Sequence, residues 1–356
     1  MNNPLHKLPL DINFENKIIL KAVISASRSL AELKGEAKTI PNEEILINTL
    51  FVQEAKDSSE IENIVTTHDD IFKSELDDKI KNSASKEVRD YIRAIKLGFD
   101  EVKEHGLLTN RAILNIQKCI QHNNAGFRKM PGTSLKDGKG NIVYEPPQDP
   151  KHIQELMTNL EAYINDDTLQ DIDPLIKMAI VHFQFESIHP FYDGNGRTGR
   201  IINILYMVKN HLLDLPILYL SRYIIQNKEN YYRLLNKLNN NTQNEEDWQE
   251  WILFMINGVE ETARHTISTI KSIKSLMNEF EDELKTKTNF YSKDLLETLF
   301  VHPYVKISSF GDELEIHRHT ASSYLAKLES LNLLSLKTYG KAKYYINDGL
   351  LDILKK

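Results

Sequence analysis

The stretch that decides the fold of this chain is "HPFYDGNGRTGR", residues 189–200. It places one histidine, one aspartate, two arginines and three glycines within twelve residues. Apolar residues recur at helical spacing on both sides of it: Ile176, Ala179, Ile180 and Phe183 before it, and Ile201, Ile204, Leu205 and Val208 after it. This pattern predicts a chemically active loop between two buried helices.

The glycines and arginines of this loop indicate a site for a polyphosphate. Glycine at 194, 196 and 199 lets the backbone adopt left-handed angles and approach a ligand closely. The loop also opens into a helix N-terminus, where unpaired amides bind anions. Because Arg197 and Arg200 are three residues apart, we expect both guanidinium groups to reach the ligand from one side of the helix.

Asp193 and His189 complete the chemistry of such a site. Asp193 would repel a phosphate but can hold a Mg²⁺ ion that binds one. His189, with an ordinary pKa of roughly 6.5, can accept a proton from a hydroxyl group. The alternative interpretation is a plain turn, with His189 bonded to a carbonyl at a helix end. The complete set favours the polyphosphate site, because a turn needs one glycine rather than three and gains nothing from two arginines.

Length and composition limit the classes of protein to which the chain can belong. Its 356 residues exceed one core of typical size, and we expect domains at 1–104, 105–285 and 286–356. The single cysteine, Cys119, excludes an internal disulfide framework and a multi-cysteine metal site. The net charge of −7 argues against a surface that binds nucleic acid all round. With no secretory signal and no apolar run of membrane-spanning length, we expect a cytoplasmic protein without a membrane partner.

Helical spacing of apolar residues dominates the chain, so the expected fold class is mainly α. Helices are expected over 42–56, 86–104, 109–121 and about 150–165, and from Pro174 onward. Residues 132–147, "GTSLKDGKGNIVYEPP", predict a small β-hairpin flap, because a turn-rich centre leads into a β-prone run that two prolines end. Beyond residue 285, three helices and two strands are typical of a winged helix-turn-helix domain, with its third helix at about Arg318–Ser330.

The loop resembles the Fic family signature, HxFx(D/E)GNGRxxR, and matches every specified position from His189 to Arg200. The resemblance extends over roughly residues 40–265, and the C-terminal unit resembles the winged helix of some members. It implies a Fic-type helical core. It also implies a protein adenylyltransferase, which moves AMP from ATP, with Mg²⁺, to the hydroxyl group of a Tyr, Thr or Ser side chain on a target protein.

The resemblance gives each position of the loop a role. It implies that His189 is the general base, that Asp193 is the Mg²⁺ ligand, and that Phe191 anchors the loop in the core. The implied phosphate ligands are Gly194, Asn195, Gly196 and Arg197, with Arg200 on the γ-phosphate. The segment "ENYYRLLNKLNN", residues 229–240, is similar to the adenosine side of the family's site, which implies Tyr231, Tyr232 and Asn239. Tyrosines at helical spacing also suit plain packing, and that alternative stays open.

A second motif points to regulation. Ser58, Glu62 and Asn63 match the inhibitory motif (S/T)xxxE(G/N) of Fic proteins in its N-terminal placement. The resemblance implies that Glu62 pairs with Arg200 and occupies the place of the γ-phosphate. The alternative is local, because Ser59 followed by Glu62 also fits a capping box at a helix start.

The flap and the C-terminal unit are the expected contacts with partners. In the family a hairpin beside the active site pairs with an extended target segment, and the matching residues here are Ile142, Val143 and Tyr144. An ordinary surface hairpin would show the same pattern. The identity of the target is left open, and the chain itself is one candidate. A homodimer is left open as well.

The competing function is a DNA-binding transcriptional regulator whose Fic body senses a nucleotide. Residues suited to phosphate contacts lie on the expected recognition helix and wing: Arg318, His319, Ser322, Ser323, Lys327, Lys341 and Lys343. Acids are nearly as numerous as bases in this unit, and winged helices also bind proteins, so both partners remain open.

Overall fold

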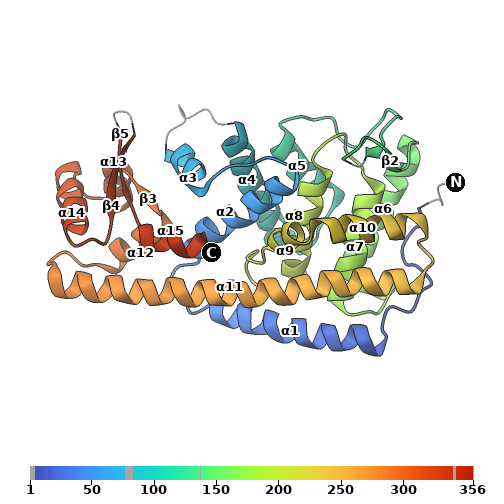
Figure 1. Ribbon diagram of the computed structural model, residues 1–356, viewed down its shortest axis with the longest axis horizontal. Helices are drawn as coiled ribbons and strands as arrows, with labels where there is room; N and C mark the ends of the chain where they lie inside the picture. The colour runs from blue at the N-terminus through green and yellow to red at the C-terminus, as the bar shows by residue number, and fades with distance from the viewer. Residues whose placement is uncertain (1–4, 77–82, 137, 340–341, 356) are drawn as a thin grey trace.

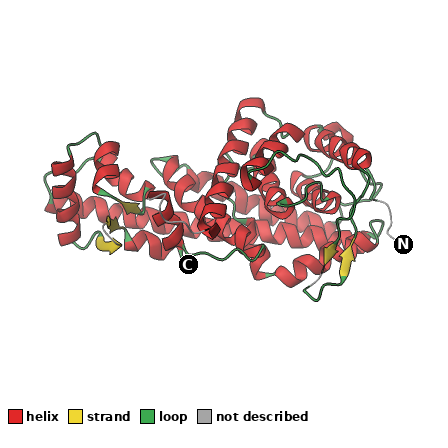
Figure 2. Cartoon of the chain, turned by 90° about the horizontal axis from the view of Figure 1, so that it is seen from above, coloured by secondary structure: helices red, strands yellow, loops and turns green. Residues whose placement is uncertain are grey.

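The computed structural model describes residues 5–76, 83–136, 138–339 and 342–355. The chain forms an elongated, mainly helical molecule, with a large body at one end and a small C-terminal unit at the other (Figure 1). The two small sheets lie at opposite ends (Figure 2). The expected fold class is therefore confirmed: a mainly α body with a β-hairpin, followed by a unit with a small sheet.

The N-terminal region supplies the helices that surround the motif-bearing core. They are α1 (Lys17–Ala37), α2 (Glu43–Ile61), α3 (His68–Leu76), α4 (Ser83–His105) and α5 (Asn110–Gln121). Helix α2 begins as expected after Asn42, whose side chain accepts a hydrogen bond from the Glu44 amide at 3.0 Å. It continues past the expected end at residue 56 to Ile61, and this additional turn carries Ser58 into the body.

The core of the body contains the two helices that flank the motif. Its elements are β1 (Leu135–Lys136), β2 (Ile142–Tyr144), α6 (Pro150–Asn165), a 3-10 turn (Asp167–Leu169), α7 (Pro174–Ile188), α8 (Asn195–Lys209), α9 (Leu220–Gln226) and α10 (Lys228–Asn240). Prolines occupy the first turns of α6 and α7, where the missing N–H has no helical partner. Almost every side chain of α7 is buried, because α6, α8 and α11 pack around it.

Helix α11 (Glu245–Lys287) extends along the molecule from the body to the C-terminal unit (Figure 1). It packs against α1, α7, α9 and α10 in the body and against α12 and α15 in the C-terminal unit. Both tryptophans, Trp248 and Trp251, are buried on its body half. The domain boundary expected near residue 285 falls in its last turn.

The C-terminal unit packs directly on α2. Its elements are α12 (Lys293–Val301), β3 (Tyr304–Val305), α13 (Ile307–Glu313), α14 (Arg318–Ser330), β4 (Ser335–Tyr339), β5 (Ala342–Ile346) and α15 (Asp348–Leu354). The expected third helix is confirmed as α14, and the strands form an antiparallel sheet in the order β3-β5-β4. Helices α12 and α15 contact α2, and the Gln53 side chain donates a hydrogen bond to the Leu354 carbonyl.

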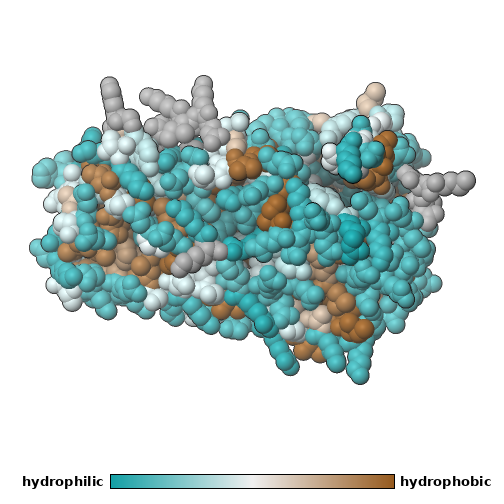
Figure 3. Space-filling model, in the orientation of Figure 1, coloured by the Kyte–Doolittle hydropathy of each residue, from teal (hydrophilic) through white to brown (hydrophobic). Residues whose placement is uncertain are grey.

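The molecule has one continuous apolar core and a mostly polar surface. Buried apolar side chains from the N-terminal helices, the body and the C-terminal unit belong to a single cluster. On the face in Figure 3, apolar residues gather in separate patches within a hydrophilic surface. Within the described ranges, no helix has both the length and the apolar character needed to cross a bilayer.

Candidate active site

The motif forms a tight loop that reverses the chain between α7 and α8. His189 ends α7 in a left-handed conformation (φ 48°), and Gly194 precedes α8 with φ 82°. The side chain of Asn195 bridges the loop, because its Oδ1 accepts from the Phe191 amide and its Nδ2 donates to the Phe191 carbonyl, both at 2.8 Å. Phe191 is fully buried against Phe185. The asparagine side chain therefore braces the loop rather than facing a ligand.

The three glycines serve two different purposes. Of the three, only Gly194 has a positive φ; Gly196 and Gly199 lie in the regular first turns of α8, which corrects the expectation of left-handed angles at all three positions. Gly196 and Gly199 are required because the space around them is too small for a Cβ atom. A Cβ at Gly196 would lie closer than 3.0 Å to the Glu62 carboxylate, and one at Gly199 would clash with the Glu186 carboxyl group.

Arg128 holds His189 in place from outside the motif. Its Nε donates to the His189 carbonyl at 2.7 Å, and its backbone amide donates to the Pro190 carbonyl at 2.8 Å. Burial, assisted by the nearby Arg128 charge, lowers the pKa of His189 to about 4. The sequence suggested an ordinary pKa; the structure gives a neutral imidazole at neutral pH, which can accept a proton.

Arg200 is buried and is held by two residues of α2. Its Nε donates to the Ser58 hydroxyl at 2.8 Å, and its Nη2 donates to the Ser58 carbonyl and to Glu62 Oε1, each at 2.9 Å. Burial alone would raise the pKa of Glu62, but the Arg200 guanidinium outweighs it and holds that pKa below its ordinary value. Glu62 is therefore a carboxylate paired with the last arginine of the motif.

Asn63 explains how Glu62 reaches Arg200. Glu62 is the residue at which α2 ends, and Asn63 follows in a left-handed conformation (φ 64°). The Ile64 amide then bonds back to the Ser59 carbonyl at 3.0 Å, which closes the helix end. The capping-box alternative for Ser59 and Glu62 is wrong, because these residues lie at the end of a helix and not at its start.

Arg197 does not converge with Arg200. Its Nη1 pairs with Glu87 Oε2 of α4 at 3.1 Å, and the side chain is almost fully buried. The expectation that both arginines reach one ligand therefore does not hold in this conformation, in which each is paired with a different carboxylate. The position of Glu87 far upstream in the chain left no local sequence signal for this pair.

A cavity of about 630 Å³ lies beside the motif. Expected site residues that line it are Glu62, Asn63, Val143, His189, Gly196, Arg200, Tyr231, Tyr232 and Asn239. Expected residues outside its lining are Ser58, Ile142, Tyr144, Asp193, Gly194, Asn195 and Arg197. The volume is within the range of small-molecule sites in proteins. An imidazole, a guanidinium group and the first turn of a helix therefore face one hollow.

Helix α10 forms the opposite wall. Tyr231 is buried, and its hydroxyl group pairs with His182 Nε2 at 2.8 Å. Tyr232 is 40% exposed and meets Tyr231 edge to face. Asn239 accepts a hydrogen bond from the Ser187 hydroxyl at 2.8 Å. Tyr231 thus fits the packing alternative, whereas Tyr232 presents an aromatic surface to the cavity.

Four polar residues of the cavity wall have no role in the expectations from sequence: Lys136, Glu186, Lys228 and Asn236. Glu186 lies one helical turn before His189, and burial raises its pKa to about 7. Lys228 begins α10 and donates a hydrogen bond to the Ile61 carbonyl at 2.7 Å. The three-residue spacing between Glu186 and His189 could have indicated that both side chains face the site. The contact of Lys228 with Ile61 joins distant parts of the chain, so no local sequence pattern predicts it.

Both strands of the flap contribute to the cavity wall, because Leu135 and Lys136 of β1 line it as well as Val143 of β2. Strand β2 pairs antiparallel with β1, and Val143 lines the cavity. Ile142 is 56% exposed, as an edge residue that meets a partner would be. Tyr144 instead donates from its hydroxyl group to the Ser187 carbonyl at 2.9 Å and so ties the flap to α7.

Judged from the described part of the chain, Asp193 could hold Mg²⁺ only together with ligands from outside the chain. Its side chain is exposed beside the N-terminus of α8, and its Oδ1 accepts from the Gly194 amide at 2.6 Å. Among the described residues, no group of three or more His, Cys, Asp or Glu side chains could hold a metal alone. Mg²⁺ commonly binds one or two carboxylates and completes its shell with phosphates and water, so a single aspartate beside an anion site fits.

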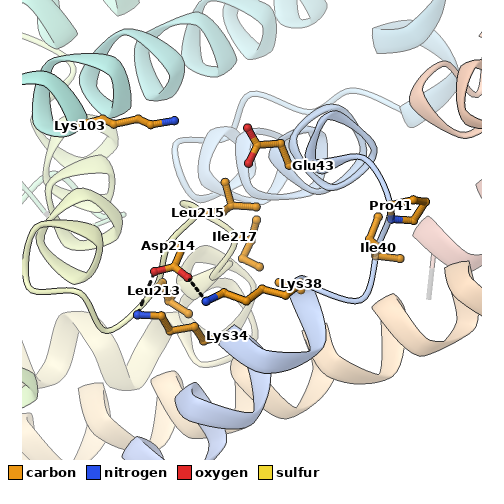
Figure 4. A pocket seen from close by; sticks show the side chains of 11 residues that line it. Lys34, Lys38, Ile40, Pro41, Glu43, Lys103, Leu213, Asp214, Leu215 and Ile217 are labelled. Atoms are coloured by element: carbon orange, nitrogen blue, oxygen red, sulfur yellow. Dashed lines mark ion pairs between the residues drawn. The ribbon is translucent and has the colours of Figure 1, made fainter.

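Another hollow, of about 560 Å³, lies between α1, α4 and the segment after α8 (Figure 4). Lys34 on α1 and Lys38, the residue that follows this helix, both point to Asp214 and pair with it at 2.9 and 3.0 Å (Figure 4). These charges are already matched, and the hollow lacks the imidazole and guanidinium groups of the first cavity. The cavity beside His189 is therefore the candidate active site.

Three family models match successive parts of the chain. The Fic/DOC family N-terminal model matches residues 20–100, and the Fic/DOC family model matches residues 107–207, which include the motif. A model described as the C-terminal domain of SoFic-like protein adenylyltransferase matches residues 276–350.

Individual relatives agree with these models over short segments. The protein adenylyltransferase fic-1 of Caenorhabditis elegans is 36% identical over 64 residues, which are 18% of this chain and 13% of that protein. A probable protein adenylyltransferase of Aquifex aeolicus is 36% identical over 81 residues, which are 23% of this chain and 24% of its own. The chain thus matches less than a quarter of the length of these relatives.

Solved structures share the fold across most of the chain. A Fic family protein from Desulfovibrio desulfuricans aligns with a TM-score of 0.58 over 95% of this chain and 98% of its own, at 19% identity. Fic-1 from C. elegans aligns with a TM-score of 0.52 over 71% and 74%, also at 19% identity. By the matched family models, the chain belongs to the Fic/DOC family, with the family's N-terminal region and a SoFic-like C-terminal domain.

Proposed function

We propose that this chain is a protein adenylyltransferase that moves AMP from ATP to a hydroxyl side chain of a target protein. The observation that carries the proposal is the single cavity onto which His189, Arg200 and the first turn of α8 face. A neutral imidazole beside a helix N-terminus suits a reaction in which a phosphate must be held and one proton removed. The names of the matched relatives support the same reaction.

The transfer needs no nucleophile from the protein. The hydroxyl oxygen of the target forms a bond to the α-phosphorus of ATP, the bond to pyrophosphate breaks, and the hydroxyl proton passes to His189. The amides at the start of α8 and Arg200 hold the phosphates, and Asp193 would hold Mg²⁺. When bound, that ion would neutralise charge on the phosphates.

We further infer that Glu62 inhibits the transfer. Its carboxylate occupies the Arg200 guanidinium at 2.9 Å, and the Ser58 hydroxyl fixes the same guanidinium at Nε. A γ-phosphate would need the Nη2 atom that Glu62 now uses. With Glu62 in place, ATP would have to bind without its full set of phosphate contacts, which leaves the α-phosphorus badly oriented for attack.

The reaction is tested by incubating the protein with α-labelled ATP and Mg²⁺. We expect weak self-labelling of the wild type, strong labelling of Glu62→Gly, and none of Glu62→Gly combined with His189→Ala. Mass analysis should find a gain of one AMP. Equal labelling of the wild type and Glu62→Gly, with both folded, would contradict the inhibitory role; a different mass gain would contradict the reaction.

The target is proposed to pair with the flap. Strand addition beside β2 uses backbone hydrogen bonds, so it would accept many sequences and would present a Tyr, Thr or Ser hydroxyl to His189. The exposed Ile142 suits a contact with such a segment. The labelling experiment in cell extract identifies the target, and labelling of the chain itself, within one copy or across a homodimer, is the simplest case.

A second candidate function is DNA binding by the C-terminal unit. It is favoured by the exposure of Arg318, His319 and Lys327 along α14 and of Lys343 on β5. Lys341, the other expected wing residue, lies outside the described residues. A gel shift that strengthens as salt falls supports DNA as the partner, since phosphate contacts release counterions. Failure to bind at low salt favours a protein partner.

A further inference from the structure

The last turn of α2, which carries the inhibitory residues, is fastened to α10 by one side chain. Lys228 Nζ donates a hydrogen bond to the backbone carbonyl of Ile61 at 2.7 Å. Lys228 is half-buried and lines the cavity, as do Ile61 and Glu62. The contact joins α2 to α10, which are far apart in the sequence. Ile61 directly precedes Glu62, whose carboxylate pairs with Arg200.

The position of this ammonium group is electrostatically favourable. The last carbonyls of a helix have no helical partner and carry partial negative charge, so a cation there stabilises the helix end. Helix α2 has no basic residue in its own last turn. Lys228 supplies that charge from α10, and it also contributes to the lowered pKa of Glu62.

We propose that Lys228 is a positioning residue for inhibition: it holds the last turn of α2 so that Glu62 stays on Arg200. The inference deepens the proposed function and rests on it. Among the described residues, the Glu62 side chain bonds to one other side chain, that of Arg200, whereas the helix end that presents it has a second attachment through Lys228. Removing that attachment shifts the population toward states in which Arg200 is free.

The competing role for Lys228 is to bind the nucleotide directly, since its ammonium group lines the cavity. The two roles predict opposite results once Glu62 is absent. A residue that acts only by holding Glu62 has no effect in the Glu62→Gly protein. A residue that binds phosphate lowers activity in that background.

The experiment is a double-mutant cycle on the whole 356-residue chain with α-labelled ATP and Mg²⁺. We expect Lys228→Met to raise wild-type self-labelling roughly three- to tenfold, as the loss of one charge-assisted hydrogen bond from the inhibited state would. In the Glu62→Gly background it should change labelling by less than about twofold. Lys228→Arg should restore inhibition, because a guanidinium group can also donate to the Ile61 carbonyl.

The matched control is Lys237→Met on the same helix. Lys237 pairs with Asp247 and Glu250 and is not part of the cavity lining, so its replacement should leave basal labelling unchanged. Unchanged labelling by Lys228→Met in the wild-type background overturns the proposal. Lower labelling by Lys228→Met in the Glu62→Gly background, with an unaltered melting temperature, overturns it in favour of nucleotide binding.

Hydrogen exchange separates this inference from the proposed function. The amides of Glu62, Asn63 and Ile64 are bonded within the end of α2, so Lys228→Met should speed their exchange relative to Lys237→Met. This readout needs no activity. Absence of labelling in every variant would refute the adenylyltransferase proposal, whereas unchanged exchange in Lys228→Met would refute the positioning role.

Discussion

At the scale of single residues, His189 shows how burial keeps an imidazole neutral. The main chain places it at the end of α7 in a left-handed conformation, and Arg128 fixes its carbonyl. Burial and the positive charge of Arg128 disfavour the protonated ring and lower its pKa to about 4. The imidazole is therefore ready to accept a proton throughout the neutral range.

This lowered pKa predicts the pH dependence of the transfer. The ring is protonated only below about pH 4, so kcat/KM of the Glu62→Gly protein should stay level from neutral pH down to about pH 5 and fall below that. The measurement is initial-rate labelling across pH, with a folding check by circular dichroism at each point. An acidic limb near the ordinary histidine value of roughly 6.5 would contradict the described environment.

At the scale of elements, the backbone at the end of α2 positions the Glu62 carboxylate on Arg200. Asn63 is left-handed there, and the turn it forms aims Glu62 at Arg200. Asparagine and glycine tolerate this conformation, while a residue with an ordinary Cβ pays roughly 1–2 kcal/mol for it. The third position of the inhibitory motif thus has a conformational role.

The left-handed conformation of Asn63 at the end of α2 predicts different basal labelling for two substitutions at this position. Asn63→Gly should keep inhibition, because glycine adopts the left-handed turn readily. Asn63→Ala should raise basal labelling by about threefold or more, since the strain destabilises the turn by roughly 1–2 kcal/mol. Labelling with α-labelled ATP compares the two. Equal basal labelling by both variants would contradict a conformational role for this position.

The space around Gly199 in α8 and Gly35 in α1 predicts opposite effects on stability when each is replaced by alanine. A Cβ at Gly199 would meet the Glu186 carboxyl group and Phe185, so Gly199→Ala should destabilise the protein by about 1–3 kcal/mol. Gly35 in α1 has open space around it, so Gly35→Ala should stabilise by about 0.5–1 kcal/mol. Urea unfolding measures both. A stabilising Gly199→Ala would show that this close approach is not present in solution.

At the scale of the whole molecule, the C-terminal unit and the motif-bearing body share their framework. Helix α11 extends through both, and α12 and α15 pack on α2, the helix that carries Ser58. The rings of Phe72 and Tyr304 stack at 5.8 Å across the same interface. A partner that binds the C-terminal unit would therefore act on a surface that supports α2, the helix to which we assign inhibition.

The shared core predicts that the two ends unfold together. Leu299 of α12 is fully buried, so Leu299→Ala should destabilise by about 2–5 kcal/mol. Both tryptophans lie in the body, so their fluorescence reports the body alone. The variant should lower the melting temperature by tryptophan fluorescence and by circular dichroism equally. A fluorescence transition that stays at the wild-type temperature would instead show independent domains.

The sequence by itself determined the parts of this protein that depend on local pattern. Apolar spacing located α6, α7 and α14, the turn residues located the flap, and the twelve residues from His189 located the loop and its family. These features follow from backbone preferences and periodicity, which act between near neighbours in the chain. The boundaries were less certain, and α2 continues beyond its expected end to Ile61.

Only the tertiary structure decided which carboxylate pairs with Arg197 and which neighbours require glycine at Gly196 and Gly199. The family motif implied the pair of Arg200 with Glu62, whereas Arg197 and Glu87 lie more than a hundred positions apart and no local pattern encodes their pair. Likewise, the need for Gly199 comes from the Glu186 side chain of another helix. Burial set the pKa of His189, because desolvation depends on everything that packs around the ring once the chain has folded.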